Sequence, residues 1–242
     1  MGYIGVHRSC NTADYGLPQR RWRVWLVYHR VGLADMDILL KCMQIFRCDA
    51  ASVSMFVMED SVPVFELPRQ AFNLETLHNL MKLHKERRWP QKLQDFIEKH
   101  ALSTESLSWA MQCLERCPAF HGLRARGQTV LIARYAYLKQ VRNVDATATR
   151  VIFQYDQSVD RCPTGFGQVP CVCPKGRYWD SLLKRSLHAV EHAALQGIGK
   201  EEIALFGLEN VPSALLADLI GNSFSGNVCA IVVLSTLAAW KR

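Results

Sequence analysis

Two arginines and a glutamine near the start of the chain are the residues best placed to do chemistry. Gln19, Arg21 and Arg23 follow the turn-forming residues 15–18, YGLP. Glycine and proline favour a turn, and the residues after it read as a strand in which Arg21 and Arg23 share one face about 6–7 Å apart. A guanidinium donates hydrogen bonds in pairs, which suits phosphate or a base edge. A basic turn entering a buried edge strand is the simpler alternative.

The segment around these residues resembles a known motif. Residues 14–24, DYGLPQRRWRV, are similar to the Q-x-R-x-R block of the DNA (cytosine-5) methyltransferases. In that family the block follows a short strand, here residues 3–6, and opens a hydrophobic strand. The resemblance implies that Arg21 and Arg23 hold the flipped cytosine and the active-site loop, and that Gln19 shapes the turn.

Two later segments resemble further blocks of this family, in the family's order. Residues 185–198, RSLHAVEHAALQGI, are similar to the ninth block, and Gly197 is expected to end a short helix there. Residues 220–225, IGNSFS, are similar to the tenth block, with Gly221 predicted to permit a tight turn. The resemblance places this loop beside the S-adenosylmethionine pocket. Asn222 and Ser223 would therefore border that cofactor, next to a helix N-terminus that favours an anion.

The segment before the ninth block differs from the family in a chemically relevant way. Residues 169–176, VPCVCPKG, are similar to the family's P-x-x-T-x-T segment, with cysteines where threonines are usual. The family's nucleophile is a cysteine thiolate that adds to a cytosine flipped out of the duplex. Pro170-Cys171 and Glu209-Asn210-Val211 match parts of the family's catalytic motifs. Both lie after the Q-x-R-x-R block, whereas the family's catalytic motifs precede it. We expect neither to be catalytic, and we expect the nucleophile and the glycine-rich donor turn on a second chain or a missing segment.

The middle of the chain carries the basic residues expected to contact DNA. The net charge of +7 and the pI near 9.0 favour an anionic partner, nucleic acid first. Residues 31–160 stand where the family keeps its target-recognition region. Solvated helix faces are the alternative to DNA contact for the basic residues in it, which are Arg87, Arg88, Arg124, Arg126 and Arg134.

Periodicity predicts a mostly helical middle segment between short strands. Helices are expected within residues 33–43, across 70–100 with a break at Trp89-Pro90, from a cap at Ser103 to Cys117, and over 122–142. Short strands are expected within 53–58 and 151–155, and a Gly/Pro-rich loop over 163–179.

Composition sets the expected location and partners. The nine cysteines are irregularly spaced and the N-terminus has no leader pattern, which indicates reduced thiols, an intracellular location (nuclear in a eukaryote) and no metal site. The longest apolar run, residues 228–240, falls short of the roughly twenty residues that span a membrane, so a buried helix and no membrane are expected.

The predicted fold class is α/β: the C-terminal part of a Rossmann-like, S-adenosylmethionine-dependent methyltransferase domain with a mostly helical insert. Residues 1–30 would be the last strands of the sheet, 31–160 the target-recognition insert and 161–242 the closing segment. The expected function is DNA recognition together with part of the cofactor and cytosine pocket, inactive without the other half. A non-catalytic DNA-binding or regulatory module and a tRNA cytosine methyltransferase fragment are the alternatives.

Overall fold

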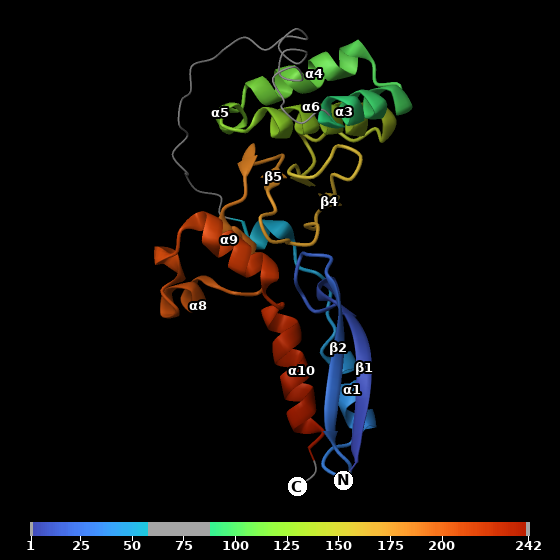
Figure 1. Cartoon of the computed structure of the whole chain (residues 1–242), viewed down its shortest axis with the longest axis vertical. Helices are drawn as coiled ribbons and strands as arrows, with labels where there is room; N and C mark the ends of the chain where they lie inside the picture. Colours follow the sequence, from blue (N-terminus) through green and yellow to red (C-terminus); the bar gives the residue numbers. More distant parts are fainter. Residues whose placement is uncertain (1, 58–87, 241–242) are drawn as a thin grey trace. The chain divides into compact units, whose positions relative to one another are not determined.

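The computed structural model describes residues 2–57 and 88–240. This part of the chain has a mixed α/β fold with two small antiparallel sheets (Figure 1). The chain forms two compact units. Unit 1 comprises Met1–Met58, Gln168–Lys175 and His188–Arg242, and unit 2 comprises Glu59–Gly167 and Gly176–Leu187. Each unit is described by itself.

A long β-hairpin forms one side of unit 1. Strands β1 (Tyr3–Asn11) and β2 (Trp22–Arg30) pair antiparallel and confirm the two predicted strands. The predicted turn lies between them after η1 (Thr12–Asp14), with Gly16 at φ 83°, where glycine is favoured. Successive side chains of β2 point to opposite faces of the hairpin. On one face Trp25 and Val27 pack against the core of unit 1, whose buried members include Cys10, Tyr15, Leu39, Met43, Val228 and Val232.

Helices complete unit 1, and one predicted strand there is wrong. Helix α1 (Met36–Ile45) confirms the predicted helix, and Asp35 caps it by accepting hydrogen bonds from the Asp37 and Ile38 N–H groups. The strand expected within 53–58 is instead the 3-10 turn η2 (Val53–Met55), because the Ser52 side chain caps a turn at Ser54 N. The remaining elements are α7 (Ala189–Leu195), α8 (Lys200–Leu205), η3 (Leu208–Asn210), α9 (Ser213–Asn222) and α10 (Gly226–Ala238).

Helix α10 is less buried than its apolar sequence suggests. Val228, Val232 and Ser235 are its buried residues, while Val233, Leu234 and Leu237 are exposed. The prediction of a buried helix is therefore wrong for one side of it. Among the described residues, the stretch Ser213–Ala238 is long and apolar enough to cross a membrane, a property that core helices of globular proteins share. Residues 223–225 separate α9 from α10 within that stretch.

Unit 2 comprises helices and a four-stranded sheet. Helices α3 (Arg88–Lys99), α4 (Thr104–Glu115), α5 (Pro118–His121) and α6 (Ala125–Val141) come first in the chain. The sheet has the order β4-β3-β5-β6, from β3 (Val151–Gln154), β4 (Thr164–Phe166), β5 (Tyr178–Asp180) and β6 (Arg185–Ser186). Strands β4 and β5 lie where the sequence predicted only a loop.

The helix boundaries in unit 2 agree in part with the predictions. The Ser103 hydroxyl accepts a hydrogen bond from Ser106 N–H at 3.1 Å, which confirms the predicted cap of α4. Pro90 is the third residue of α3, so the described residues show no break in the helix at Trp89-Pro90. Residues 70–87 of the predicted helix lie outside the described residues. Helix α6 is buried along most of its length and is not an amphipathic surface helix.

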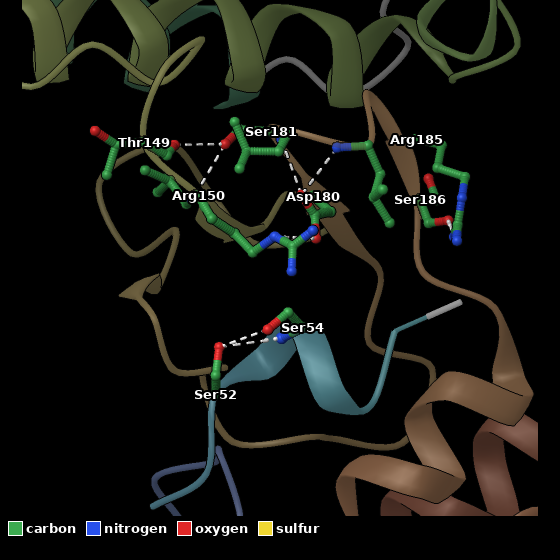
Figure 2. A network of polar contacts seen from close by, with 11 residues as sticks. Ser52, Ser54, Thr149, Arg150, Asp180, Ser181, Arg185 and Ser186 are labelled. Atoms are coloured by element: carbon green, nitrogen blue, oxygen red, sulfur yellow. Dashed lines mark hydrogen bonds and ion pairs between the residues drawn. The ribbon is translucent and has the colours of Figure 1, made fainter. Parts of the chain in front are cut away.

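A polar network joins the strands of unit 2 (Figure 2). Arg150 Nε lies 3.3 Å from Asp180 Oδ2, and Asp180 Oδ1 accepts hydrogen bonds from Leu182 N–H and Leu183 N–H. Burial raises the pKa of the Asp180 carboxyl, although these N–H groups and Arg150 oppose the shift. Ser181 Oγ donates to Thr149 O and accepts from Val151 N–H, so the network fixes the start of β3 beside the end of β5.

Candidate functional site

Gln19 ties three segments of unit 1 together. Its buried side-chain amide donates hydrogen bonds to Leu195 O and Gln196 Oε1, both at 3.0 Å. Its carbonyl oxygen accepts from Val172 N–H at 2.8 Å. Val172 belongs to Gln168–Lys175, which we call the strap. The Gln19 side chain therefore fixes the turn before β2 against both the strap and the end of α7.

Arg21 extends these connections to the end of α9. Its guanidinium donates to Val172 O at 2.6 Å, to Gly221 O at 3.3 Å and to Ser223 O at 2.8 Å. The side chain is only 3% exposed. A buried guanidinium that serves three backbone carbonyls holds segments together, so the geometry makes Arg21 a positioning residue.

Arg23 is exposed and has a chemically different neighbour. It donates to Trp22 O at 2.8 Å and forms a hydrogen bond with the side chain of Cys171 in the strap. A hydrogen bond from Cys173 lowers the pKa of the Cys171 thiol to about 6, and the charges of Arg21 and Arg23 act in the same direction against burial. The site therefore places a guanidinium beside a thiol whose pKa is lowered.

The residues expected to border the cofactor lie at the end of α9. Asn222 is exposed and its amide donates to Asp218 O at 3.0 Å, while Ser223 Oγ donates to Ile220 O at 2.7 Å. At the start of α10, Gly226 N–H donates to Gln196 O at 2.8 Å, so the protein itself already uses one of the N–H groups expected to favour an anion. Ser225 Oγ is buried and has no hydrogen-bond partner among the described residues. These groups fit one polar edge of an S-adenosylmethionine site but do not form a complete pocket.

Gly221 is needed for packing and not for the predicted tight turn. It lies within α9, and a Cβ atom added there would lie 2.2 Å from Pro174 N and 2.4 Å from Cys173 C. Only a residue without a side chain allows α9 to approach the strap so closely. Gly197 does end α7 as predicted, at φ 78°.

A second feature of unit 1 is a hollow of about 500 Å³ near the end of α7. The described residues that line it do not include the predicted site residues. They are Leu17, Met55, Phe56, Val57, Ala194, Gly197, Gly199, Lys200, Glu202 and Asn227.

Unit 2 contains a hollow of about 380 Å³ that combines rings and positive charge, which we call the aromatic cleft. The ring centroids of Phe96 and Tyr137 both lie 4.6 Å from that of His100. The Arg134 guanidinium lies 5.1 Å from the Tyr137 ring centroid and 5.7 Å from that of Phe96. The full lining is Lys92, Asp95, Phe96, Lys99, His100, Arg134, Tyr137 and Asp160. Phe96 is buried in the core of unit 2, but the partly exposed rings of His100 and Tyr137 beside cationic groups suit stacked bases and phosphates.

Among the described residues, the predicted DNA-binding arginines Arg124, Arg126 and Arg134 do not form one cluster. Arg134 lies in the aromatic cleft and donates to Thr164 Oγ1 at 2.8 Å. Arg124 is exposed at the start of α6, and Arg126 is half-buried about 12 Å from Arg134 along the helix. Arg87 and the side chain of Arg88 lie outside the described residues.

The structure brings Phe96 and Lys99 to the aromatic cleft and Cys171 beside Arg23, and the sequence predicted none of these three as a site residue. Lys92, Phe96 and Lys99 are spaced at i, i+4 and i+7 on α3, a helical spacing that puts all three on one face of the helix. Cys171 was expected to be neither catalytic nor a metal ligand. Its C-x-C pairing with Cys173 was the available signal for a reactive thiol.

Comparison with models of known protein families gives no match, and comparison with curated proteins gives no match either.

Proposed function

We propose that this chain supplies the C-terminal part of a Rossmann-like, S-adenosylmethionine-dependent DNA (cytosine-5) methyltransferase. One observation carries the proposal. The three segments that resemble family blocks, far apart in the sequence, form a single hydrogen-bonded cluster. Gln19 bonds to Gln196, and Arg21 bonds to Gly221 and Ser223. A chance likeness of three short strings would not require their named residues to bond to one another.

The proposed roles follow from burial. Gln19 and Arg21 are buried and hold the wall of the site, while exposed Arg23 is the group that contacts the flipped cytosine. Asn222 and Ser223 form one polar edge of the cofactor site. The cofactor supplies the methyl group when it is bound.

The exposed face of the hairpin supports the proposal that a donor-binding half completes the fold. On the face of β2 turned from the core, Trp22, Val24, Leu26 and Tyr28 are each more than 60% exposed. A two-stranded hairpin is only marginally stable alone, and a contiguous apolar face is typical of an interface. We propose that the donor-binding half of the methyltransferase sheet, in a second chain or a further segment, covers this face.

The direct test is methyl transfer from labelled S-adenosylmethionine to duplex DNA, with and without a chain that carries a donor-binding half. We expect transfer only in the mixture, and loss of transfer with Leu26→Lys, because a charge on the apolar face prevents assembly. Leu205→Lys, which replaces an exposed leucine on α8, is the matched control. No transfer in the mixture would contradict the proposal. Replacing the duplex with tRNA tests the RNA alternative.

The role of Arg23 can be tested separately in the assembled enzyme. Arg23→Ala should lower kcat/KM by roughly a hundredfold or more and change DNA affinity little, because its contact is with the flipped base. Arg30→Ala, an exposed arginine at the other end of β2, should change neither. If Arg23→Ala lowered kcat/KM and DNA affinity equally, Arg23 would contact a DNA phosphate and not the flipped base.

The aromatic cleft supports a second candidate, a non-catalytic DNA-binding module. Its rings and the cations Lys92, Lys99 and Arg134 suit nucleic acid without any contribution from unit 1. Salt-dependent DNA binding with no methyl transfer in the mixture would favour this candidate.

A further inference from the structure

Two cysteines lie two residues apart in the strap. Cys171 and Cys173 are each partly exposed, and all nine cysteines of the chain, which fall within the described residues, are present as thiols. Cys173 Sγ donates to Cys171 O at 3.2 Å, and the two side chains also hydrogen-bond to each other. The two sulfur atoms are therefore neighbours on a segment that reagents in solution can reach.

The charges that face Cys171 favour its thiolate. They are the guanidiniums of Arg21 and Arg23, the second of which also donates a hydrogen bond to the sulfur. Together with the Cys173 hydrogen bond, which is the largest cause, they lower the pKa of Cys171 to about 6 although burial opposes them. Roughly nine-tenths of a thiol with this pKa is ionised at pH 7.

The other cysteines with shifted pKa values have raised pKa values, opposite to that of Cys171. Burial raises the pKa of Cys117 to about 11 and that of Cys162 to about 12. It also raises the pKa of Cys113 and of Cys229. Of these five cysteines, Cys171 alone has a lowered pKa.

We propose that Cys171 is a peroxide-reactive cysteine and that Cys173 is its resolving partner. The Cys171 thiolate attacks one oxygen of hydrogen peroxide, so that an S–O bond forms, the O–O bond breaks and hydroxide leaves. Cys173 then attacks the resulting sulfenic acid. The S–S bond forms, the S–O bond breaks, and water leaves with the thiol proton. Two thiols are oxidised to one disulfide, and hydrogen peroxide is reduced to two molecules of water.

This inference does not depend on the proposed function. The family that the chain resembles usually has threonines in this segment, so the pair is a feature of this chain. A disulfide within a C-x-C segment closes a small, strained ring, which small thiols reduce easily. Because small thiols reduce this disulfide, the modification is reversible. Its formation also removes the negative charge of Cys171 beside Arg23, so oxidation changes the electrostatics of the candidate site.

Peroxide treatment of the full chain tests the chemistry. The reduced protein is exposed to hydrogen peroxide at pH 7, sulfenic acid is trapped with dimedone, and the products are mapped by peptide mass spectrometry. We expect a Cys171–Cys173 disulfide in the wild type. In Cys173→Ser we expect dimedone on Cys171, because the resolving thiol is absent. Cys48→Ser, which removes an exposed cysteine, should leave the disulfide unchanged.

The rate at which iodoacetamide alkylates Cys171 tests whether the pKa of this thiol is lowered by its neighbours. In the wild type this rate should be half-maximal near pH 6, and it should fall about tenfold from pH 7 to pH 5. Arg23→Gln should slow alkylation of Cys171 at pH 7 by about twofold, and Arg30→Gln should not. The wild-type pH profile remains informative even if Arg23→Gln fails to fold.

Three results would overturn the proposal. The first is alkylation of Cys171 at pH 7 no faster than that of the more exposed Cys48. The second is a pH midpoint above 8 for Cys171 alkylation. The third is peroxide oxidation that leaves Cys171 reduced or pairs it with a cysteine other than Cys173.

Discussion

Neighbouring arginines on one predicted strand face have different roles because their burial differs. Arg21 precedes the first residue of β2 and is buried against three backbone carbonyls, whereas Arg23 lies inside β2 and is exposed. Alternation predicts that the two share a face, but it does not predict which of them the strap covers. The strap covers Arg21 through Val172, which lies 151 residues from Arg21 in the sequence.

We predict that Arg21→Met lowers the free energy of unfolding by about 2–4 kcal/mol, because three buried carbonyls lose their donor. Arg23→Met should cost less than about 1 kcal/mol, since its side chain is exposed. Chemical denaturation followed by tryptophan fluorescence measures both changes. Equal losses in the two variants would show that Arg21 does not connect the strap to α9.

At the scale of elements, the approach of α9 to the strap depends on one position. We predict that Gly221→Ala lowers the free energy of unfolding by about 3 kcal/mol or more, because the new methyl group meets the backbone of Cys173 and Pro174. Backbone atoms cannot rotate away as a flexible side chain does. Asn222→Ala, at the exposed next position, should cost less than about 1 kcal/mol. Thermal melts compare the two, and similar losses would contradict this account of Gly221.

Helix α7 adds a pH dependence to unit 1. Burial lowers the pKa of His192 to about 4, below the ordinary value of about 6.5. Between these values the unfolded chain binds a proton that the folded chain excludes, so stability is full above pH 6.5 and falls as the pH drops toward 4. The shift corresponds to about 3 kcal/mol. We predict that His192→Gln reduces this loss, whereas exposed His7→Gln does not. Melting temperatures of the wild type and both variants, measured between pH 7 and pH 4, test this prediction. Parallel curves of melting temperature against pH for the wild type and His192→Gln would contradict it.

Elements with a strong local signal were predictable from the sequence, and elements that depend on distant partners were not. Both strands of the hairpin, the Ser103 cap and the Gly197 helix end follow from local turn and capping chemistry. Strands β4 and β5 lie in a Gly/Pro-rich segment and form because β3 pairs with both of them. The apolar run of α10 indicated a helix, but periodicity does not indicate how much of a helix its neighbours cover.

The candidate site was predictable only in part, for the same reason. The resemblance identified Gln19, Arg21 and the residues around 220, and the structure brings these together. The lowered pKa of Cys171 was predictable only in part: its largest cause is the hydrogen bond from Cys173, two residues away, but the charges of Arg21 and Arg23 come from roughly 150 residues away in the sequence. The aromatic cleft combines α3 with α6, whose shared face becomes evident only when the helices are packed.

At the scale of the whole molecule, the net charge of +7 predicts DNA binding that weakens with salt. We predict that Lys99→Gln, which removes a cation from the rim of the aromatic cleft, reduces the slope of log affinity against log salt by about one. Lys41→Gln, on the exposed side of α1, should leave the slope unchanged. Fluorescence anisotropy with a labelled duplex between 50 and 200 mM salt measures the slope. An unchanged slope for Lys99→Gln would exclude the aromatic cleft from DNA contact.

The strap has a consequence for how the molecule is made. It belongs to unit 1, although the strands on either side of it, β4 and β5, belong to unit 2. About 140 residues separate the end of β2 from the strap, so a ribosome adding about 5–20 residues per second takes about 7–30 s to synthesise them. During that time Gln19 and Arg21 have no strap to bind, and Trp25 and Val27 of β2 lack Val228 and Val232, which belong to the core they pack against. Assembly of the site therefore waits until the strap has been synthesised, and slowing translation within unit 2 prolongs the period in which the nascent hairpin is prone to aggregate.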